Sequence, residues 1–467
     1  MIELHHHKSI PPSLEEYPFA DRNVPYGTEI YEPSPEELNK IKNNISTPVS
    51  PHKSPTVKGI VKCIIDTDIG TDFDDTLALL YALNLENLEI LGITTNYGPT
   101  QLRSLVTHKI VDSYLKYHPE RNPIPIISGA NFQLGTHREI FIKGNEGRPF
   151  INTEEFLKYT DDSNWENNSQ TVASEFIAET INSNQPGTVT IISIGIMTNI
   201  ALAFQHHPEI VQKVKEIVVM GGGSFMTQAD DHLVGQYTTN PKLWSRNIKE
   251  MTEKMPENKY SVLNFVCEGN LIHLFPNHNL SGDTMAAVRV FSNASVPMKI
   301  ICHSVTSRFW LEGRPIQFFH DKAREARLKG KIDDDDVPGV VGLIMEEWFK
   351  RRNGQNGQCP HDPLTVHEAA FGGDDSPVYY VNGTFIVHEW AAFSTFIPNK
   401  DGKHLLGIHV DQEDTKAFLE WLGRRLTNNY KKENDKTTPI FLVSHFHWKL
   451  IFFFYISFFI LCLLYFF

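Results

Sequence analysis

Five aspartates crowd into ten consecutive positions, directly after one apolar run and directly before another. The stretch reads VKCIIDTDIGTDFDDTLALLYAL over residues 61–83, and its acidic residues are Asp66, Asp68, Asp72, Asp74 and Asp75. Like charges repel at this spacing, and a carboxylate buried without a partner costs several kcal/mol. Capping a helix N-terminus returns only about 0.3 to 1 kcal/mol per carboxylate. We therefore expect a cation among them, and a hard divalent ion with oxygen ligands is the simplest candidate.

The spacing excludes the calcium-binding loop of an EF-hand. Counted from Asp66, that loop needs Gly at its sixth position and Glu at its twelfth, where this chain has Thr71 and Leu77. A backbone carbonyl and one distant carboxylate would instead complete the coordination of the cation.

Short β-rich apolar runs alternate with longer amphipathic ones between residues 60 and 428. VKCIID precedes DDTLALLYALNL, LEILGITTN precedes LRSLVTHKIVDSYLKYH, and TVTIISIG precedes TNIALAFQHH. This alternation predicts βαβ units on an open, mostly parallel Rossmann-like sheet with helices on both faces. Ligands of such sheets bind at the carboxyl ends of the strands, and the aspartates lie between the first strand and the first helix.

Composition and charge narrow the class of protein. With 41% hydrophobic and 21% charged residues, the 467-residue chain has the composition of an ordinary globular protein. Its net charge of -13 argues against a nucleic-acid partner, because phosphate binding needs a basic surface. The five cysteines have no CxxC spacing, so we expect reduced thiols and a catalytic domain that faces the cytoplasm.

The two ends of the chain differ from its middle in composition. Residues 1–58 are rich in Pro, Ser and Asn and predict an irregular extension, followed by a catalytic domain over 59–430 with an insertion at about 227–266. A linker is expected at 431–449, before an uncharged segment at 450–467. These 18 residues reach the lower limit of a membrane helix. A membrane tail anchor and translated non-coding sequence remain alternative explanations of the segment.

Several stretches, taken in order, resemble the inosine-uridine preferring nucleoside hydrolase family. DTDIGTDFDD is similar to the family's N-terminal aspartate motif, with two residues inserted before the final pair. EILGITTNYG, ISIGIMTNIALA, EIVVMGGG and CPHDPLTV follow, and the block that begins EGNLIHLFPNHN resembles the family's substrate loop. The resemblance covers residues 60–428. It implies calcium-dependent hydrolysis of ribonucleosides to ribose and free base in nucleoside catabolism and salvage, by a homo-oligomer.

The resemblance also implies a role for particular residues. The implied calcium ligands are Asp68, Asp75, the carbonyl oxygen of Thr198, and Asp362. Asp68 would also be the general base, and His361 would protonate the leaving base. The chemistry asks for such a set, because an oxocarbenium-like ribose needs acceptors beside its hydroxyls and a water on the face opposite the base.

Four side chains are implied as substrate contacts: Asp74, which would hold a ribose hydroxyl, Asn270, Asn277 and Asn279. Three positions depart from the family's pattern. Pro99 replaces an Asn, Asn277 replaces a Glu that grips the ribose, and Ser304 replaces an Asp or Asn. The aspartate machinery therefore matches the family, while the sugar and base contacts are altered.

Two other functions fit parts of this pattern. A haloacid-dehalogenase-like phosphatase also begins with a strand and Asp-x-Asp, but its companion Lys and later acidic pair are not evident here. The stronger rival is a diverged, non-catalytic calcium and ribosyl-ligand binding protein tethered to a membrane. The substitutions at Pro99, Asn277 and Ser304 favour this rival, and the presence of Asp68 and His361 argues against it.

Overall fold

The computed structural model describes ten stretches of the chain and one single residue. They are residues 59–134, 144–161, 170–225, 272–293, 295–330, 336–352, 356–372, 376–388, 393–410 and 412–427, together with Tyr430. The N-terminal extension, the insertion, the linker and the apolar tail predicted from the sequence all lie outside these ranges.

A ten-stranded sheet forms the centre of the molecule. Its strands run parallel from β3 to β12 and antiparallel across β10, β11 and β6. The mostly parallel sheet of the sequence prediction is confirmed. In spatial order the strands are β3 (Ile126–Ser128), β2 (Leu88–Thr95), β1 (Val61–Thr67), β4 (Val189–Ser193), β5 (Val214–Met220), β7 (Met298–Ile301), β12 (His404–Val410), β10 (Val378–Val387), β11 (Ser394–Pro398) and β6 (Ile272–Leu274).

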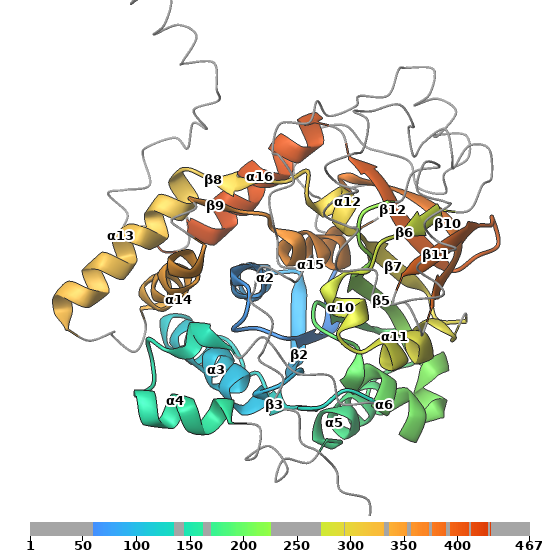
Figure 1. Cartoon of the computed structure of the whole chain (residues 1–467), viewed down its shortest axis with the longest axis horizontal. Helices are drawn as coiled ribbons and strands as arrows, with labels where there is room; N and C mark the ends of the chain where they lie inside the picture. Colours follow the sequence, from blue (N-terminus) through green and yellow to red (C-terminus); the bar gives the residue numbers. More distant parts are fainter. Residues whose placement is uncertain are drawn as a thin grey trace, which may run out of the picture.

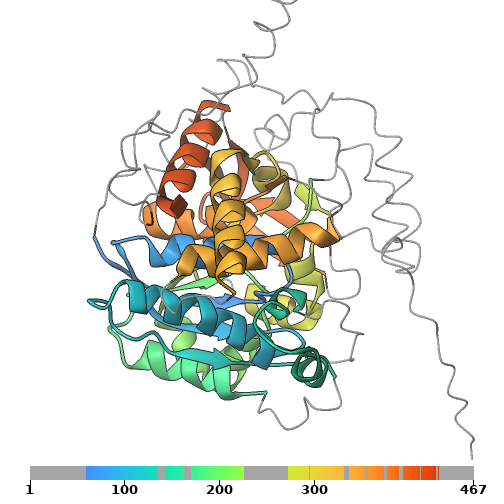
Figure 2. The same cartoon turned by 90° about the vertical axis from the view of Figure 1, so that its left-hand side faces the viewer.

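Helices lie above and below the central strands in the side view (Figure 2). In Figure 1, α2 and α15 lie side by side, and α5, α6 and α11 form a separate group. The helices are α2 (Phe73–Leu83), α3 (Thr100–Tyr117), α4 (Thr153–Thr160), α5 (Val172–Asn182), α6 (Thr198–His206), α10 (His278–Ser281), α11 (Thr284–Phe291), α12 (His303–Thr306), α13 (Arg314–Lys329), α14 (Val337–Arg351), α15 (His361–Phe371), α16 (Gln412–Thr427) and the 3-10 helices η2 (Asn145–Gly147) and η4 (Pro208–Gln212). A separate two-stranded sheet pairs β8 (Leu311–Glu312) with β9 (Gly357–Gln358).

The centre of the sheet explains why the aspartates are buried. β1 lies between β2 and β4, so its apolar run is covered on both edges and both faces. Every residue of α2 is buried, because the helix packs against α15 as well as against the strands. The loop that joins β1 to α2 therefore enters the interior at the carboxyl edge of the sheet.

Within the described ranges, no helix combines the length and the apolar character needed to cross a bilayer.

Candidate metal centre and active site

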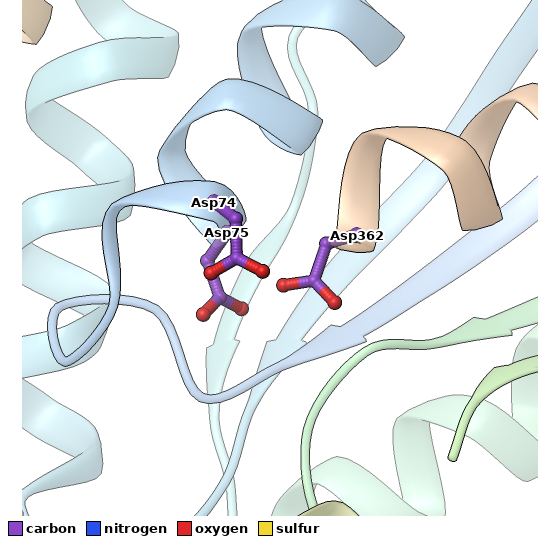
Figure 3. Close-up of side chains that lie close together, drawn as sticks. All are labelled: Asp74, Asp75 and Asp362. Atoms are coloured by element: carbon purple, nitrogen blue, oxygen red, sulfur yellow. The ribbon is translucent and has the colours of Figure 1, made fainter. Parts of the chain in front are cut away.

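Three carboxylates from two helices meet at the carboxyl edge of the sheet. Asp74 and Asp75 stand in the first turn of α2, and Asp362 is the second residue of α15. One oxygen atom from each lies within 4.8 Å of the others. Figure 3 shows the three side chains converging across the gap between the two helix ends. Since 286 positions separate Asp362 from the nearest of the others along the chain, the fold alone creates this cluster.

Burial raises the free-energy cost of keeping the three clustered carboxylates ionised. Asp74, Asp75 and Asp362 are 5%, 3% and 3% exposed. Burial, and then the carboxylates of Asp74, Asp75 and Asp68, hold the pKa of Asp362 well above its usual value. The pKa of Asp75 is likewise raised, by burial first and then by Asp68. A set of buried oxygen ligands that repel one another is the arrangement that a hard divalent cation stabilises.

The helix ends help to hold the cluster in place. Asp72 caps α2 by accepting a 2.8 Å hydrogen bond from the Phe73 backbone N–H. The hydroxyl of Thr67, the last residue of β1, donates to Asp75. The N-termini of α2 and α15 both point their partial positive charge at the carboxylates. Partial charges of this size offset only part of the repulsion between the aspartates.

Asp66, near the end of β1, is bonded to three polar side chains from other segments. Its two carboxylate oxygens accept hydrogen bonds from the hydroxyl of Thr94 at 2.6 Å and from the amides of Asn96 at 3.0 Å and Asn199 at 2.8 Å. Burial raises the pKa of Asp66 to about 7, although these three hydrogen bonds lower it. Asp66 therefore ties the end of β2 and the loop after it to the first turn of α6, and its side chain positions these segments.

Asp68, the predicted base, faces a histidine that the sequence analysis did not single out. The Nε2 atom of His278 in α10 lies 3.3 Å from Oδ2 of Asp68, and the imidazole is 30% exposed. Burial acts to raise the pKa of Asp68, but His278 and then the charge of Arg103 outweigh it, so the pKa is lowered. The ring of Tyr97 meets that of His278 edge-on at 5.1 Å between centroids. Asp68 is thus held ionised beside the cluster.

The turn after β4 approaches the backbone of Asp68 closely. A Cβ on Gly195 would lie 2.7 Å from the Asp68 amide nitrogen and 2.7 Å from Oδ1 of Asn96, so this position has room for glycine alone. Thr198, whose carbonyl was predicted as a ligand, begins α6 just beyond this turn, and its hydroxyl donates to Asp283 at 2.6 Å.

His361 stands beside Asp362 at the start of α15 and is 7% exposed. Its Nδ1 lies 2.6 Å from the hydroxyl of Thr306. The ring of His303 stacks on it at 5.3 Å between centroids, with 27° between the planes. The fold therefore fixes the orientation of His361 and adds a second imidazole to the same wall.

The predicted sugar-contacting amides are bonded to backbone. Asn277 caps α10, and its Oδ1 accepts from Leu280 N at 3.2 Å and from Gly222 N at 3.1 Å. The amide of Asn279 donates to Ile194 O and Met220 O, both at 3.1 Å. Asn270 lies outside the described residues.

The other two substituted positions are also structural. Pro99 is the N-cap residue that precedes α3, where a missing N–H removes no hydrogen bond of the helix. The Ser304 hydroxyl accepts a 2.8 Å hydrogen bond from Phe225 N.

Four contributors to the site had no clear signal in the sequence: His278, His303, Arg103 and Thr306. A lone histidine or arginine in a helix is usually a surface residue, and spacing does not show which other segment it will meet. His278 stands between the two amides that the resemblance singled out, so that motif was the only pointer to it.

A sequence model of the inosine-uridine preferring nucleoside hydrolase family matches residues 63–408. Among curated proteins, an uncharacterised protein of Schizosaccharomyces pombe is 34% identical over 168 residues, which is 35% of this chain and 49% of the relative. A probable uridine nucleosidase 1 of rice is 34% identical over 167 residues, 35% of this chain and 47% of the relative. The inosine-uridine preferring nucleoside hydrolase of Leishmania major is 30% identical over 165 residues, which is 35% of this chain and 48% of the relative. The chain thus matches about half the length of these relatives.

Solved structures share the fold over a longer span. A plant nucleoside hydrolase aligns with 79% of this chain and 99% of its own, at a TM-score of 0.51 and 19% identity. A purine-preferring ribonucleoside hydrolase from Gardnerella vaginalis aligns with 79% of this chain and 98% of its own, at a TM-score of 0.51 and 20% identity.

Proposed function

The chain belongs to the inosine-uridine preferring nucleoside hydrolase family, and from this premise we propose that it hydrolyses the N-glycosidic bond of ribonucleosides. The products would be ribose and a free purine or pyrimidine base. The observation that carries the proposal is the meeting of Asp74, Asp75 and Asp362 beside Asp68 at the carboxyl edge of the sheet. A ribose with two adjacent hydroxyls and a water needs such a set of oxygen acceptors.

Calcium is the cofactor that we propose for these residues. The donors are oxygen atoms, as calcium prefers, and burial leaves the carboxylates with mutual repulsion that a divalent cation would relieve. Asp68, Asp75, Asp362 and the carbonyl of Thr198 are the proposed ligands, and we propose that Asp74, which lies in the same cluster, accepts from a ribose hydroxyl. When bound, calcium lowers the pKa of a coordinated water.

The proton transfers follow from the two ends of the site. Asp68 would take a proton from the attacking water, and its lowered pKa keeps it in the ionised form that a base requires. At the other end His361 would give a proton to the departing base. With Nδ1 engaged by Thr306, Nε2 is the nitrogen through which His361 would donate. The C–N bond of the nucleoside breaks as the water oxygen bonds to the anomeric carbon.

The base that is accepted has to be found by experiment. Relatives of this chain are named for uridine and for inosine with uridine, so both classes of base belong in the first panel. Oligomerisation and a membrane tail at residues 450–467 remain predictions.

A second candidate is a calcium and ribosyl-ligand binding protein without turnover. The observation that favours it is the engagement of Asn277 and Asn279 with backbone atoms, which leaves fewer sugar contacts. Each lost charged hydrogen bond to a hydroxyl would weaken substrate binding by about 1.5 to 3 kcal/mol.

Release of ribose and base from uridine, cytidine, inosine, adenosine and guanosine by the full chain tests the proposal, with Asp68→Ala as the inactive comparison. We expect turnover of at least one nucleoside by the parent protein and none by the variant. Calcium binding without release of any base would favour the second candidate.

A further inference from the structure

Arg103 brings a fully buried positive charge to the floor of the site. It stands in the first turn of α3, and none of its side chain is exposed. A guanidinium in that position is costly unless its donors are all satisfied, and arginine offers five of them in a planar fork. Where these donors go therefore shows what the residue does.

The donors of Arg103 reach two different loops. Nε donates to the carbonyl oxygen of Tyr97, in the loop after β2, at 2.7 Å. The two N–H groups of Nη1 face three acceptors, which are the carbonyl oxygen of Ile69 at 2.9 Å, the hydroxyl of Thr71 at 2.8 Å, and the carbonyl oxygen of Asp68. One side chain thus ties the loop of the predicted base to its neighbour.

Both loops have backbone shapes that need such support. Tyr97 has a φ of 67°, and it is the one non-glycine residue with positive φ in the described part of the chain. The carbonyl groups of residues 68 and 69 lie between β1 and α2, so no strand or helix partner accounts for them. Buried carbonyl groups require a donor, and Arg103 supplies it.

We propose that Arg103 is a positioning residue, which holds residues 68–71 in the shape that binds a cation before any cation arrives. This rests on the proposed function only in taking the aspartate loop as the cation site. A positive charge beside the site repels a cation, so loss of the charge alone would strengthen cation binding. Loss of positioning would weaken it, and the sign of the effect therefore separates the two roles.

Hydrogen exchange in the metal-free, full-length chain is the direct test, with Arg103→Lys as the variant. Lysine keeps the charge but lacks the planar fork that serves two loops at once. We expect about tenfold faster exchange in peptides that cover residues 66–75 and 96–98, and unchanged exchange in β5 and α6. Unchanged exchange in the two loops, or an equal rise throughout the sheet, would overturn the proposal.

Calcium titration by calorimetry supplies the second readout. Arg103→Lys and Arg103→Met should each weaken calcium binding by about tenfold or more, because both lose the carbonyl contacts. The matched control is Arg424→Met, which removes a half-exposed guanidinium bonded to Glu420 on α16 and should leave affinity unchanged. Tighter calcium binding by Arg103→Met would contradict the proposal. If Arg103→Met does not fold, the calcium affinity of Arg103→Lys replaces it, and calcium binding as tight as in the parent protein would contradict the proposal.

The two proposals fail separately. Absence of ribose release from a parent protein whose loops respond to Arg103→Lys would remove the hydrolase function and keep the positioning role. Ribose release by the parent protein, with unchanged hydrogen exchange in both loops of Arg103→Lys, would keep the hydrolase function and remove the positioning role.

Discussion

The metal side and the sugar side of the site differ in how their side chains are bonded. On the metal side, the side chains of Asp74, Asp75 and Asp362 converge, and burial together with neighbouring carboxylates raises the pKa of Asp75 and of Asp362. On the sugar side, between β6 and α11, the amides of Asn277 and Asn279 turn away and bond to backbone. Within the described residues, the helix N-termini, the Thr67 hydroxyl and the charge of Arg103 offset part of the repulsion in the first set, and a bound cation would relieve the rest. The second set is satisfied without one.

This difference shows where change is tolerated in such a site. A metal cluster needs each carboxylate, since removing one leaves the others mispositioned and the cation underbound. Sugar contacts are individually smaller, at about 1.5 to 3 kcal/mol for a hydrogen bond to a charged group. Loss of one sugar contact should therefore cost less binding than loss of one carboxylate of the cluster.

The largest effect is expected for Asp68→Asn. Loss of the base should lower kcat by about 10²- to 10⁴-fold in a ribose-release assay. Asp112→Asn is the control, because Asp112 is 60% exposed on α3 and should leave kcat unchanged. If the variant kept near-parental kcat, the metal side would not be the catalytic side.

His361→Ala should follow, with kcat lowered by about 100-fold and KM little changed. Thr306→Val removes the 2.6 Å partner of Nδ1 and should lower kcat less, because the ring itself remains. Steady-state kinetics on the best nucleoside of the panel measure both. A KM effect larger than the kcat effect would make His361 a binding residue.

Asp66 predicts a pH dependence of stability in the metal-free protein. Its folded-state pKa of about 7 lies above the value of about 3.9 in an unfolded chain. The unfolded state therefore loses the proton first as pH rises, and the free energy of unfolding falls between about pH 4 and pH 7. The fall is at most about 1.4 kcal/mol per pH unit from this group. Urea unfolding at several pH values should show it, and Asp66→Asn should flatten the slope; a parallel slope in the variant would contradict the assignment.

The smallest effect is expected for Asn277, on the sugar side of the site. Asn277→Ala removes the cap of α10 and should lower the free energy of unfolding by about 1 kcal/mol. KM should stay within about twofold of the parent, since the amide is bonded to backbone. A tenfold rise in KM without loss of stability would mean that Asn277 contacts the sugar after all.

The position of the aspartate loop at the carboxyl edge of the sheet could be predicted from the sequence, whereas contacts that join separate loops could not. Asp74 and Asp75 are adjacent and follow a strand, so their placement depends only on local structure and on the rule for parallel sheets. The mostly parallel sheet followed from the same periodicity. Arg103 and His278 act across loops that the sequence does not bring together, because their partners are backbone carbonyls or a distant carboxylate. Such contacts depend on tertiary packing and produce no characteristic residue spacing in the sequence.

The most direct test of the central claim is ribose release by the full chain before chelation, after chelation, and after calcium is restored. Loss of turnover on chelation and its recovery with calcium are the expected results, since the buried aspartates at the carboxyl edge of the sheet would then be the working centre. Turnover of the same nucleoside that is unchanged after complete removal of metal would contradict it.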